Sequence, residues 1–215
     1  MEEGKEIVPL KAHQLGRAYE LMGQAFRDDQ LLKYLVPADA KQARLGPSFV
    51  GKVVRYCLSY GEVHTTPALE GVACWLPPGH SSPTLIGMLR TRLLTEPLKF
   101  GWAGFCRFTD MVAYTEKIHK RAVPGPDWYL WGLGVEPSEQ GKGIGGALMR
   151  PILARADRDG LPCYLETQNQ RNLPFYERHG FEVVSDGEVP KRGLRVWAMV
   201  RNPHPADTNY FADTP

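Results

Sequence analysis

The chain has 215 residues, which at about 150 residues per domain predicts one large domain or one domain with an insertion. Apolar residues make up 43% and charged residues 23%, and the net charge is only +2, so neither a disordered chain nor a strongly basic nucleic-acid binder is expected. The chain contains 22 glycines and 18 prolines. Their joint share is about 19%, against the usual ~12%. This excess indicates either a fold rich in turns or a group of glycines with one local function.

Neither a membrane segment nor a metal or redox motif is expected. The chain has no run of 18 apolar residues, and its acidic start, Met1–Glu6, lacks the apolar region of a secretory signal. The four cysteines are scattered and form no Cys-x-x-Cys pair. These features predict a cytoplasmic protein with no metal and with no nucleic-acid or membrane partner, and they leave open a monomer or a homodimer.

Apolar spacing divides residues 5–127 into helices and antiparallel strands. A short apolar run over 7–10 favours an edge strand. We expect helices over 12–26, 41–60, 81–96 and 110–120, and strands over 62–66 and 71–76. The aromatic-rich stretch 97–108 fits either type.

Residues 128–203 alternate more clearly between strands and helices. We expect strands over 128–135, 163–167, 181–184 and 194–200, and helices over 143–159 and 173–179. A strand, a helix and a strand in close succession form a βαβ unit, whose two strands pair in parallel. Together with the antiparallel first half, this predicts an α/β fold with a mixed central sheet flanked by helices. We expect one domain over 5–203 and a loose tail over 204–215.

Glycines gather around the expected strand 128–135, the loop after it and the start of the next helix. Seven of the 22 glycines lie between Gly125 and Gly146, and Gln140–Gly146 reads QGKGIGG. Such a turn can present successive backbone N–H groups at a helix N-terminus, where the helix dipole is positive. Glycine also lets a ligand approach the backbone closely. The segment therefore predicts an anion site, most simply for a pyrophosphate.

Three nucleotide-binding motifs compete for this loop. A P-loop needs Ser or Thr after its lysine, but Gly143 follows Lys142, so this motif fails. Gly141–Gly146 formally matches the dinucleotide fingerprint G-x-G-x-x-G, and Glu166 follows it at about the spacing of that motif's acidic residue. The fingerprint belongs to the first strand of a doubly wound sheet, whereas this loop comes late in the chain. It stays open, as does a turn that binds no ligand.

The third motif fits best. Gln140–Gly145 matches the pattern Q/R-x-x-G-x-G/A of the acetyl-CoA loop, and this part of the chain resembles the GNAT superfamily of N-acetyltransferases. The strand before the loop and the later segment Asn172–Phe181 (NLPFYERHGF) are similar to that family's flanking motifs. The resemblance covers residues 128–200 and extends weakly over 5–127.

One further segment resembles a particular branch of the superfamily. Tyr164–Thr167 (YLET), followed by Asn172 and Phe175-Tyr176, is similar to the branch that includes puromycin acetyltransferase-like proteins.

The resemblance implies a splayed sheet, with acetyl-CoA as cosubstrate lying in the cleft beside strand 128–135. Gly132 and Gly134 inside that strand are consistent with a bulge or a close backbone approach. Residues 128–203 would form the acetyl-CoA-binding half and 5–127 the acceptor-side half. The implied acetyl-CoA contacts are Leu133, Gly134, Val135, Gln140, Gly141, Lys142, Gly143, Ile144, Gly145, Gly146, Asn172 and Tyr176.

Acyl transfer from a thioester to an amine needs a neutral amine and a proton for the leaving thiolate. The resemblance places Tyr176 beside the sulfur, and a phenol with a pKa near 10 can protonate a thiolate of pKa about 8.5. The amine must first lose a proton to a base. Glu166, at the end of the strand beside the cleft, is the candidate, and His64, His119 and Asp127 are weaker ones.

The acceptor pocket is expected within residues 5–127. Aromatic and acidic side chains suit an amine-bearing, partly apolar molecule. The candidate contacts near expected element ends are Asp29, Tyr60 and Trp75, with Asp28 and Tyr34 nearby.

Taken together, the sequence and its resemblance predict an acetyl-CoA-dependent N-acetyltransferase. It would move an acetyl group to the primary amine of a small molecule by direct attack, with no covalent enzyme intermediate. Two alternatives stay open: a protein lysine or N-terminal acetyltransferase, and a non-catalytic acyl-CoA-binding sensor domain.

Overall fold

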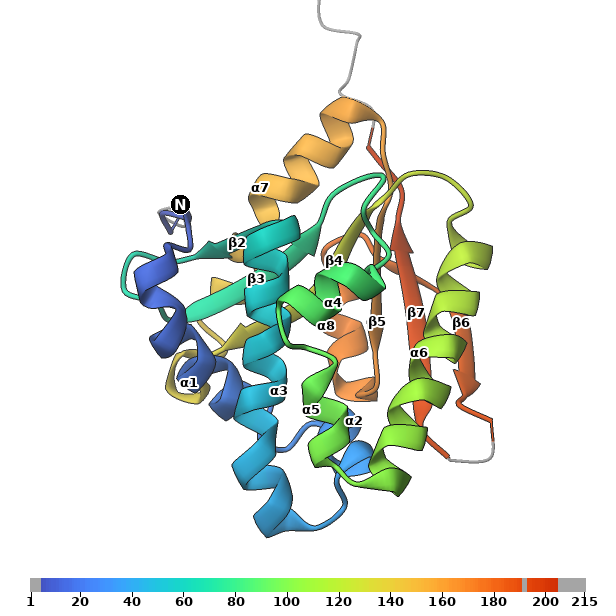
Figure 1. Ribbon diagram of the computed structural model, residues 1–215. Helices are drawn as coiled ribbons and strands as arrows, with labels where there is room; N and C mark the ends of the chain where they lie inside the picture. Colours follow the sequence, from blue (N-terminus) through green and yellow to red (C-terminus); the bar gives the residue numbers. More distant parts are fainter. Residues whose placement is uncertain (1–4, 191–192, 205–215) are drawn as a thin grey trace, which may run out of the picture.

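Seven strands form one open sheet in the order β1-β2-β3-β4-β5-β7-β6 (Figure 1). The computed structural model describes residues 5–190 and 193–204. Neighbouring strands are antiparallel except β4 and β5, which are parallel, so the predicted mixed α/β fold is confirmed. The strands are β1 (Val8–Pro9), β2 (Glu62–Thr65), β3 (Gly71–Leu76), β4 (Trp128–Val135), β5 (Cys163–Thr167), β6 (Glu182–Glu188) and β7 (Arg195–Arg201).

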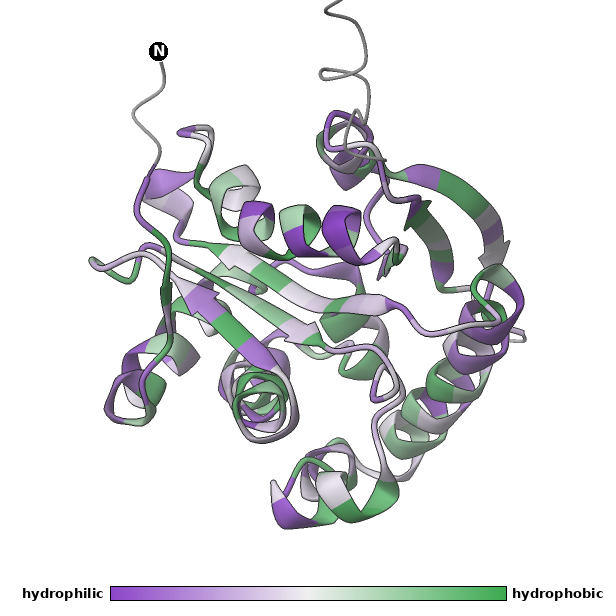
Figure 2. Cartoon of the chain, turned by 90° about the horizontal axis from the view of Figure 1, so that it is seen from above, coloured by the Kyte–Doolittle hydropathy of each residue, from purple (hydrophilic) through white to green (hydrophobic). Residues whose placement is uncertain are grey.

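Helices cover both faces of this sheet (Figure 2). One apolar cluster joins α1, α3 and α6 to one face, and a second joins α7 and α8 to the other. Alternation along β3 serves both clusters, since Cys74 faces the first and Trp75 the second. The α-helices are α1 (Leu15–Ala25), α2 (Gln30–Leu35), α3 (Asp39–Tyr60), α4 (Leu85–Arg90), α5 (Thr95–Lys99), α6 (Trp102–Ala122), α7 (Ile144–Asp159) and α8 (Leu173–Glu177). Short 3-10 turns cover Ala12–Gln14, Pro137–Glu139 and Gln170–Asn172.

Three helical regions differ from the sequence-based expectation. The helix expected over 81–96 is split into α4 and α5, because Arg92 between them adopts a left-handed φ of 61° that no helix continues through. The ambiguous stretch 97–108 belongs largely to α6, which is 21 residues long. The short helix α2 was not expected; the Asp29 carboxylate caps its start by accepting the Leu31 N–H at 2.9 Å.

The sheet splays between β4 and β5, in agreement with the implied fold. These strands pair only as far as Leu130 and Leu165, after which β4 continues on β3 alone and β5 on β7 alone. β4 also bulges at Trp131, because Leu130 lies opposite Trp75 and Gly132 opposite Cys74. In Figure 1, β2, β3 and β4 cross the view while β5 and β7 stand nearly upright. A wedge thus opens at the end of β4.

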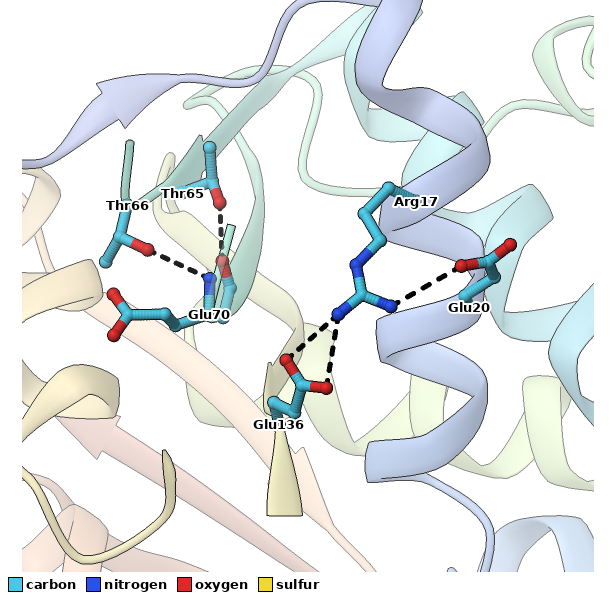
Figure 3. Close-up of polar contacts among 7 residues, drawn as sticks. Arg17, Glu20, Thr65, Thr66, Glu70 and Glu136 are labelled. Atoms are coloured by element: carbon cyan, nitrogen blue, oxygen red, sulfur yellow. Dashed lines mark hydrogen bonds and ion pairs between the residues drawn. The ribbon is translucent and has the colours of Figure 1, made fainter. Parts of the chain in front are cut away.

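Ionic contacts fix the end of β4 against α1 (Figure 3). The Arg17 guanidinium donates to both carboxylate oxygens of Glu136, at 3.2 and 3.1 Å, and also contacts Glu20. The Glu136 N–H in turn donates to the Glu70 carbonyl in the turn before β3. This network holds the point where β4 leaves the sheet and the glycine-rich loop begins.

The chain beyond β7 begins with an ordered contact. His204, expected to open a loose tail, donates its backbone N–H to the Asp157 carboxylate at 2.8 Å. The rest of the expected tail, residues 205–215, lies outside the described residues.

Candidate active site

A cleft of about 820 Å³ lies where the glycine-rich loop leads from β4 into α7. Ten of the twelve residues expected to contact acetyl-CoA line it: Leu133, Val135, Gln140, Gly141, Gly143, Ile144, Gly145, Gly146, Asn172 and Tyr176. Two do not. Lys142 pairs with Glu139 at 2.9 Å, and Gly134 faces α1, where a Cβ would lie 2.6 Å from the Met22 sulfur.

Backbone geometry makes this cleft suitable for an anion. Gly141 and Gly143 have φ values of 78° and 75°, which favour glycine. The Ala147 N–H donates to the Gly143 carbonyl. The three N–H groups before Ala147, those of residues 144–146, therefore have no partner within the helix and point out of its N-terminus.

Basic side chains surround the same cleft. Arg150, Arg178 and His179 line it. Arg201 lines it too, but is held by a two-point hydrogen bond to Asp157 at 2.7 and 2.8 Å. That bond keeps the pKa of the Asp157 carboxyl below its usual value. The loop, the positive helix end and the two arginines Arg150 and Arg178 together fit a pyrophosphate and a further phosphate.

A second cavity, of about 290 Å³, lies on the other side of β4 and is mostly apolar. Its walls come from α1 to α4, α6, β4 and β5. The larger apolar groups are Met22, Phe26, Phe49, Phe108, Met111 and Trp131. Its charged groups are the carboxyls of Asp29, Glu116 and Glu166, and within the described residues no Lys or Arg lines it. We call it the acceptor cavity.

The cleft and the acceptor cavity share three lining residues, Leu133, Asn172 and Tyr176. Tyr176 is only 8% exposed and packs between Phe175 and Phe181. Burial, with a smaller contribution from the nearby Asp29 carboxylate, raises the pKa of the Tyr176 phenol, so it holds its proton at neutral pH. A protonated phenol therefore stands where the two spaces meet.

Asn172 does not cap α8, although it occupies the position before that helix. Its side-chain N–H donates instead to the Thr167 hydroxyl at 3.1 Å. This contact fixes the end of β5 to the start of α8, on the border of both spaces.

Glu166 faces the acceptor cavity with both of its oxygens engaged. The Tyr129 hydroxyl donates to one at 2.6 Å and the Tyr164 hydroxyl to the other at 3.1 Å. Burial raises the pKa of the Glu166 carboxyl, and the Tyr129 hydrogen bond and the nearby His119 partly offset this. Of the two carboxyl-bearing candidates for the base, only Glu166 lines the cavity.

Two of the weaker base candidates form a pair. His119 Nε2 lies 2.9 Å from the Asp127 carboxylate, and His119 lines the acceptor cavity. His64 lies elsewhere, on β2, where burial lowers the pKa of its imidazole and Glu62 is its neighbour at 3.4 Å. The structure thus brings His119 to the candidate site and leaves His64 away from it.

Of the three candidate acceptor contacts, only Asp29 lies in the acceptor cavity. Trp75 is fully buried against α7, because alternation along β3 turns it to the opposite face of the sheet. Tyr60 stacks against Tyr56 at the end of α3, with ring centroids 4.9 Å apart, and lines neither space. Their placement as acceptor contacts is therefore corrected. Asp28 and Tyr34 line neither space.

A stripe along α6 supplies cavity residues of which the sequence analysis named only His119, as a weaker candidate for the base. Its members follow helical spacing: Phe108, Met111, Val112, Thr115, Glu116 and His119. The periodicity was present in the sequence, but the aromatic-rich stretch before residue 109 obscured where this helix begins.

Residues 5–190 and 193–204 contain no cluster of three His, Cys, Asp or Glu side chains placed to hold a metal ion. Over the same ranges, every helix is too short or too polar to cross a bilayer.

A mixed sheet that splays at a bulged strand, with a glycine-rich loop at the following helix, defines a GNAT-type acetyltransferase. The family model described as "Acetyltransferase (GNAT) family" matches residues 70–181, and the chain belongs to this family. Members typically use acetyl-CoA, which the cleft fits. Family membership favours the acetyl-CoA motif among those that compete for the glycine loop.

Individual relatives agree with this assignment. An uncharacterized N-acetyltransferase of Schizosaccharomyces pombe is 29% identical over 178 residues, which cover 80% of this chain and 72% of that protein. The structure of an acetyltransferase of Corynebacterium glutamicum, described as "histone acetyltransferase HPA2 and related acetyltransferase", has a TM-score of 0.64 at 20% identity and covers 95% of this chain and 99% of that one. Arylalkylamine N-acetyltransferase 2 of Aedes aegypti has a TM-score of 0.65 at 13% identity, covering 93% and 99%.

Proposed function

We propose that this acyltransferase moves the acetyl group of acetyl-CoA to the primary amine of a small, largely apolar molecule. The observation that carries the proposal is the meeting of two unlike spaces at Leu133, Asn172 and Tyr176. One space offers backbone N–H groups and cations, and the other offers apolar walls and carboxyls. A thioester from one side and an amine from the other would meet at Tyr176.

On the cosubstrate side, the N–H groups at the start of α7 would bind the pyrophosphate. The pantetheine arm would lie along Leu133 to Val135, where β4 has parted from β5 and its free edge can pair with the arm. Lys142 and Gly134 would act only indirectly, Lys142 by adding positive charge at the loop and Gly134 by letting α1 pack closely on β4.

On the acceptor side, Asp29, Glu116 and Glu166 would attract a cationic amine, and the aromatic and aliphatic walls would hold its apolar body. A volume of about 290 Å³ is at the low end for small-molecule pockets. Residues 81–93 and 108–119 contribute walls around it, which favours a small molecule over a protein segment.

The chemistry we propose is direct attack of the amine on the thioester carbonyl, with Tyr176 protonating the departing thiolate. A covalent route through a thiol would need a cysteine, and within the described residues no cysteine lines either space. Burial also raises the pKa of Cys163 to about 12, so this thiol stays protonated.

Several structural neighbours support an amine acceptor. Solved structures similar to this fold include an arylalkylamine N-acetyltransferase of Aedes aegypti and a polyamine N-acetyltransferase of Drosophila melanogaster. These two are 13% and 14% identical to this chain.

The test is steady-state release of free CoA with a panel of acceptors. The panel contains 2-phenylethylamine, tryptamine, putrescine and a lysine-containing peptide with a blocked N-terminus. We expect the first two to react with higher kcat/KM than putrescine, because the cavity walls are apolar, and the peptide to react least. A preference for the peptide would favour a protein acetyltransferase. Acetyl-CoA binding without turnover of any amine would favour a sensor domain.

A further inference from the structure

We infer that His119, held in place by Asp127, is the group that takes the proton from the acceptor's ammonium. The inference rests on the proposed function and adds the base to it, choosing His119 over Glu166, the first candidate of the sequence analysis. His119 comes from the last turn of α6, and Asp127 from the residue just before β4. The loop between them brings two side chains eight positions apart into hydrogen-bond contact.

The pair has the geometry of an imidazole oriented by a carboxylate. His119 Nε2 lies 2.9 Å from Asp127 Oδ2, and the two side chains are 9% and 2% exposed. An ionised carboxylate only accepts hydrogen bonds, so Nε2 carries the proton and the lone pair of the neutral ring lies on Nδ1. Nδ1 makes no hydrogen bond to any residue that the structure describes. Since His119 lines the acceptor cavity, this nitrogen is the one left for an amine.

Ring stacking fixes the imidazole in a second direction. The His119 and Tyr164 rings lie 3.9 Å apart, centroid to centroid, and only 5° from parallel. Tyr129 packs beside them, with its ring centroid 5.0 Å from that of His119. The base is therefore restrained by a hydrogen bond at one edge and by a ring on its face, which suits repeated proton transfer at one position.

Glu166 is less suited to be the base, although it lies in the same cavity. Each of its oxygens already accepts a hydrogen bond from a tyrosine, Tyr129 on one side and Tyr164 on the other. We assign it a positioning role: it orients the two tyrosines that pack around His119, and its carboxyl lines the cavity that the ammonium would enter.

Carboxyl and phenol groups surround this imidazole on several elements. Asp127 faces it from the loop, Tyr129 from β4, and Tyr164 and Glu166 from β5, while Glu116 lies one turn earlier on α6. The strand β7 presents aliphatic groups to this side of the sheet, namely Val196, Ala198 and Val200. None of these neighbours is a Lys or an Arg.

The step balances as follows. The ammonium gives one proton to His119 Nδ1 and becomes a neutral amine, whose lone pair forms a C–N bond to the thioester carbonyl carbon. The C–S bond then breaks, the thiolate takes the Tyr176 proton, and the nitrogen loses its second proton to restore the phenol. His119 passes the first proton to solvent. One ammonium and one acetyl-CoA thus give one amide, one CoA thiol and one proton.

The experiment compares pH–rate profiles of wild type and His119→Gln, using the most active amine of the panel. The glutamine amide can still donate to Asp127, so the fold is kept while the base is lost. We expect kcat/KM for the amine near pH 7.5 to fall by about 100- to 10,000-fold, with KM for acetyl-CoA within about twofold. Without the base, only amine already neutral in solution reacts, so the variant rate should rise about tenfold per pH unit toward the amine pKa near 10. The wild-type rate should level off at lower pH.

Two further variants keep the inference testable if His119→Gln folds poorly. Asp127→Asn should lower the rate at least about tenfold by changing which ring nitrogen carries the proton. His119→Ala should regain part of its activity when imidazole is added to the assay. His13→Gln, an exposed histidine in the first 3-10 turn, is the matched control and should behave as wild type.

The outcomes separate this inference from the proposed function. If wild type releases no CoA with any amine, the proposed function fails and the inference fails with it. If wild type is active but His119→Gln keeps its rate and its pH profile, or if imidazole rescues nothing, the inference alone is overturned.

Discussion

The cleft proposed for acetyl-CoA and the acceptor cavity lie on opposite sides of one strand, yet they are built differently. The cleft depends on backbone, since one loop and one helix start, residues 140–146, supply its central groups. The acceptor cavity depends on side chains that come from six or more elements between Met22 and Tyr176. A site made of backbone tolerates change in its neighbours, whereas a site made of side chains changes with each of them. One fold can therefore keep a fixed cosubstrate and vary its acceptor.

The largest expected effect falls on the residue that both spaces share. Tyr176→Phe removes the proton donor but keeps the ring packed between Phe175 and Phe181. We expect kcat to fall by about 100-fold or more, with KM for acetyl-CoA nearly unchanged. Steady-state kinetics measure this, and Tyr60→Phe, outside both spaces, is the control. An unchanged kcat would remove Tyr176 from the chemistry.

A smaller effect is expected when a glycine in the loop of the cleft is replaced. Gly141 and Gly160 both have a positive φ, 78° and 65°, and a Cβ on either would meet open space. Alanine at either position carries a similar strain of about 1–2 kcal/mol. Only Gly141 lies in the cleft, so Gly141→Ala should raise KM for acetyl-CoA about tenfold, while Gly160→Ala should lower the melting temperature alone. Equal effects on KM would mean that the loop conformation does not serve the cosubstrate.

The same contrast explains how much the sequence predicted. The residues at the centre of the cleft are consecutive in the sequence. The sequence therefore placed strand 128–135 correctly as β4, and the loop Gln140–Gly146 correctly after its end. The periodicity of apolar residues also predicted most strands of the sheet and most of the helices that pack on it. The split of the helix expected over 81–96 was missed because it depends on the left-handed backbone of Arg92, which no periodicity reveals.

The acceptor cavity was much harder to predict, for a physical reason. Side chains along β3 alternate between the two faces of the sheet, so Trp75 points to the core beside α7. Asp29 lies in the acceptor cavity as the residue that caps α2, although both residues are near expected element ends. The contact between His119 and Asp127 depends on how a loop closes between a helix and a strand, which spacing alone does not determine.

On the acceptor side, a single carboxyl should matter moderately. Asp29→Asn removes a negative charge near Tyr176 while keeping the shape that caps α2. We expect KM for the amine to rise about three- to tenfold, because one partly screened ion pair is worth about 1 kcal/mol. KM for acetyl-CoA should not move. Asp28→Asn, which lines neither space, is the control, and an equal rise in both variants would point to a general charge effect.

The smallest effect should appear where a residue lines the cleft but serves the fold. Arg201 is buried and bound to Asp157 by two hydrogen bonds, so Asp157→Asn should lower the free energy of unfolding by about 1 kcal/mol at pH 7. KM for acetyl-CoA should change little. Arg201 holds the pKa of Asp157 below its unfolded value. The stabilisation is therefore present above about pH 4, the unfolded pKa, and is lost as pH falls through the folded pKa. Urea unfolding of wild type and variant should differ at pH 7 and converge in acid. A constant difference at every pH would show that packing at Asp157, rather than its charge, stabilises this end of the cleft.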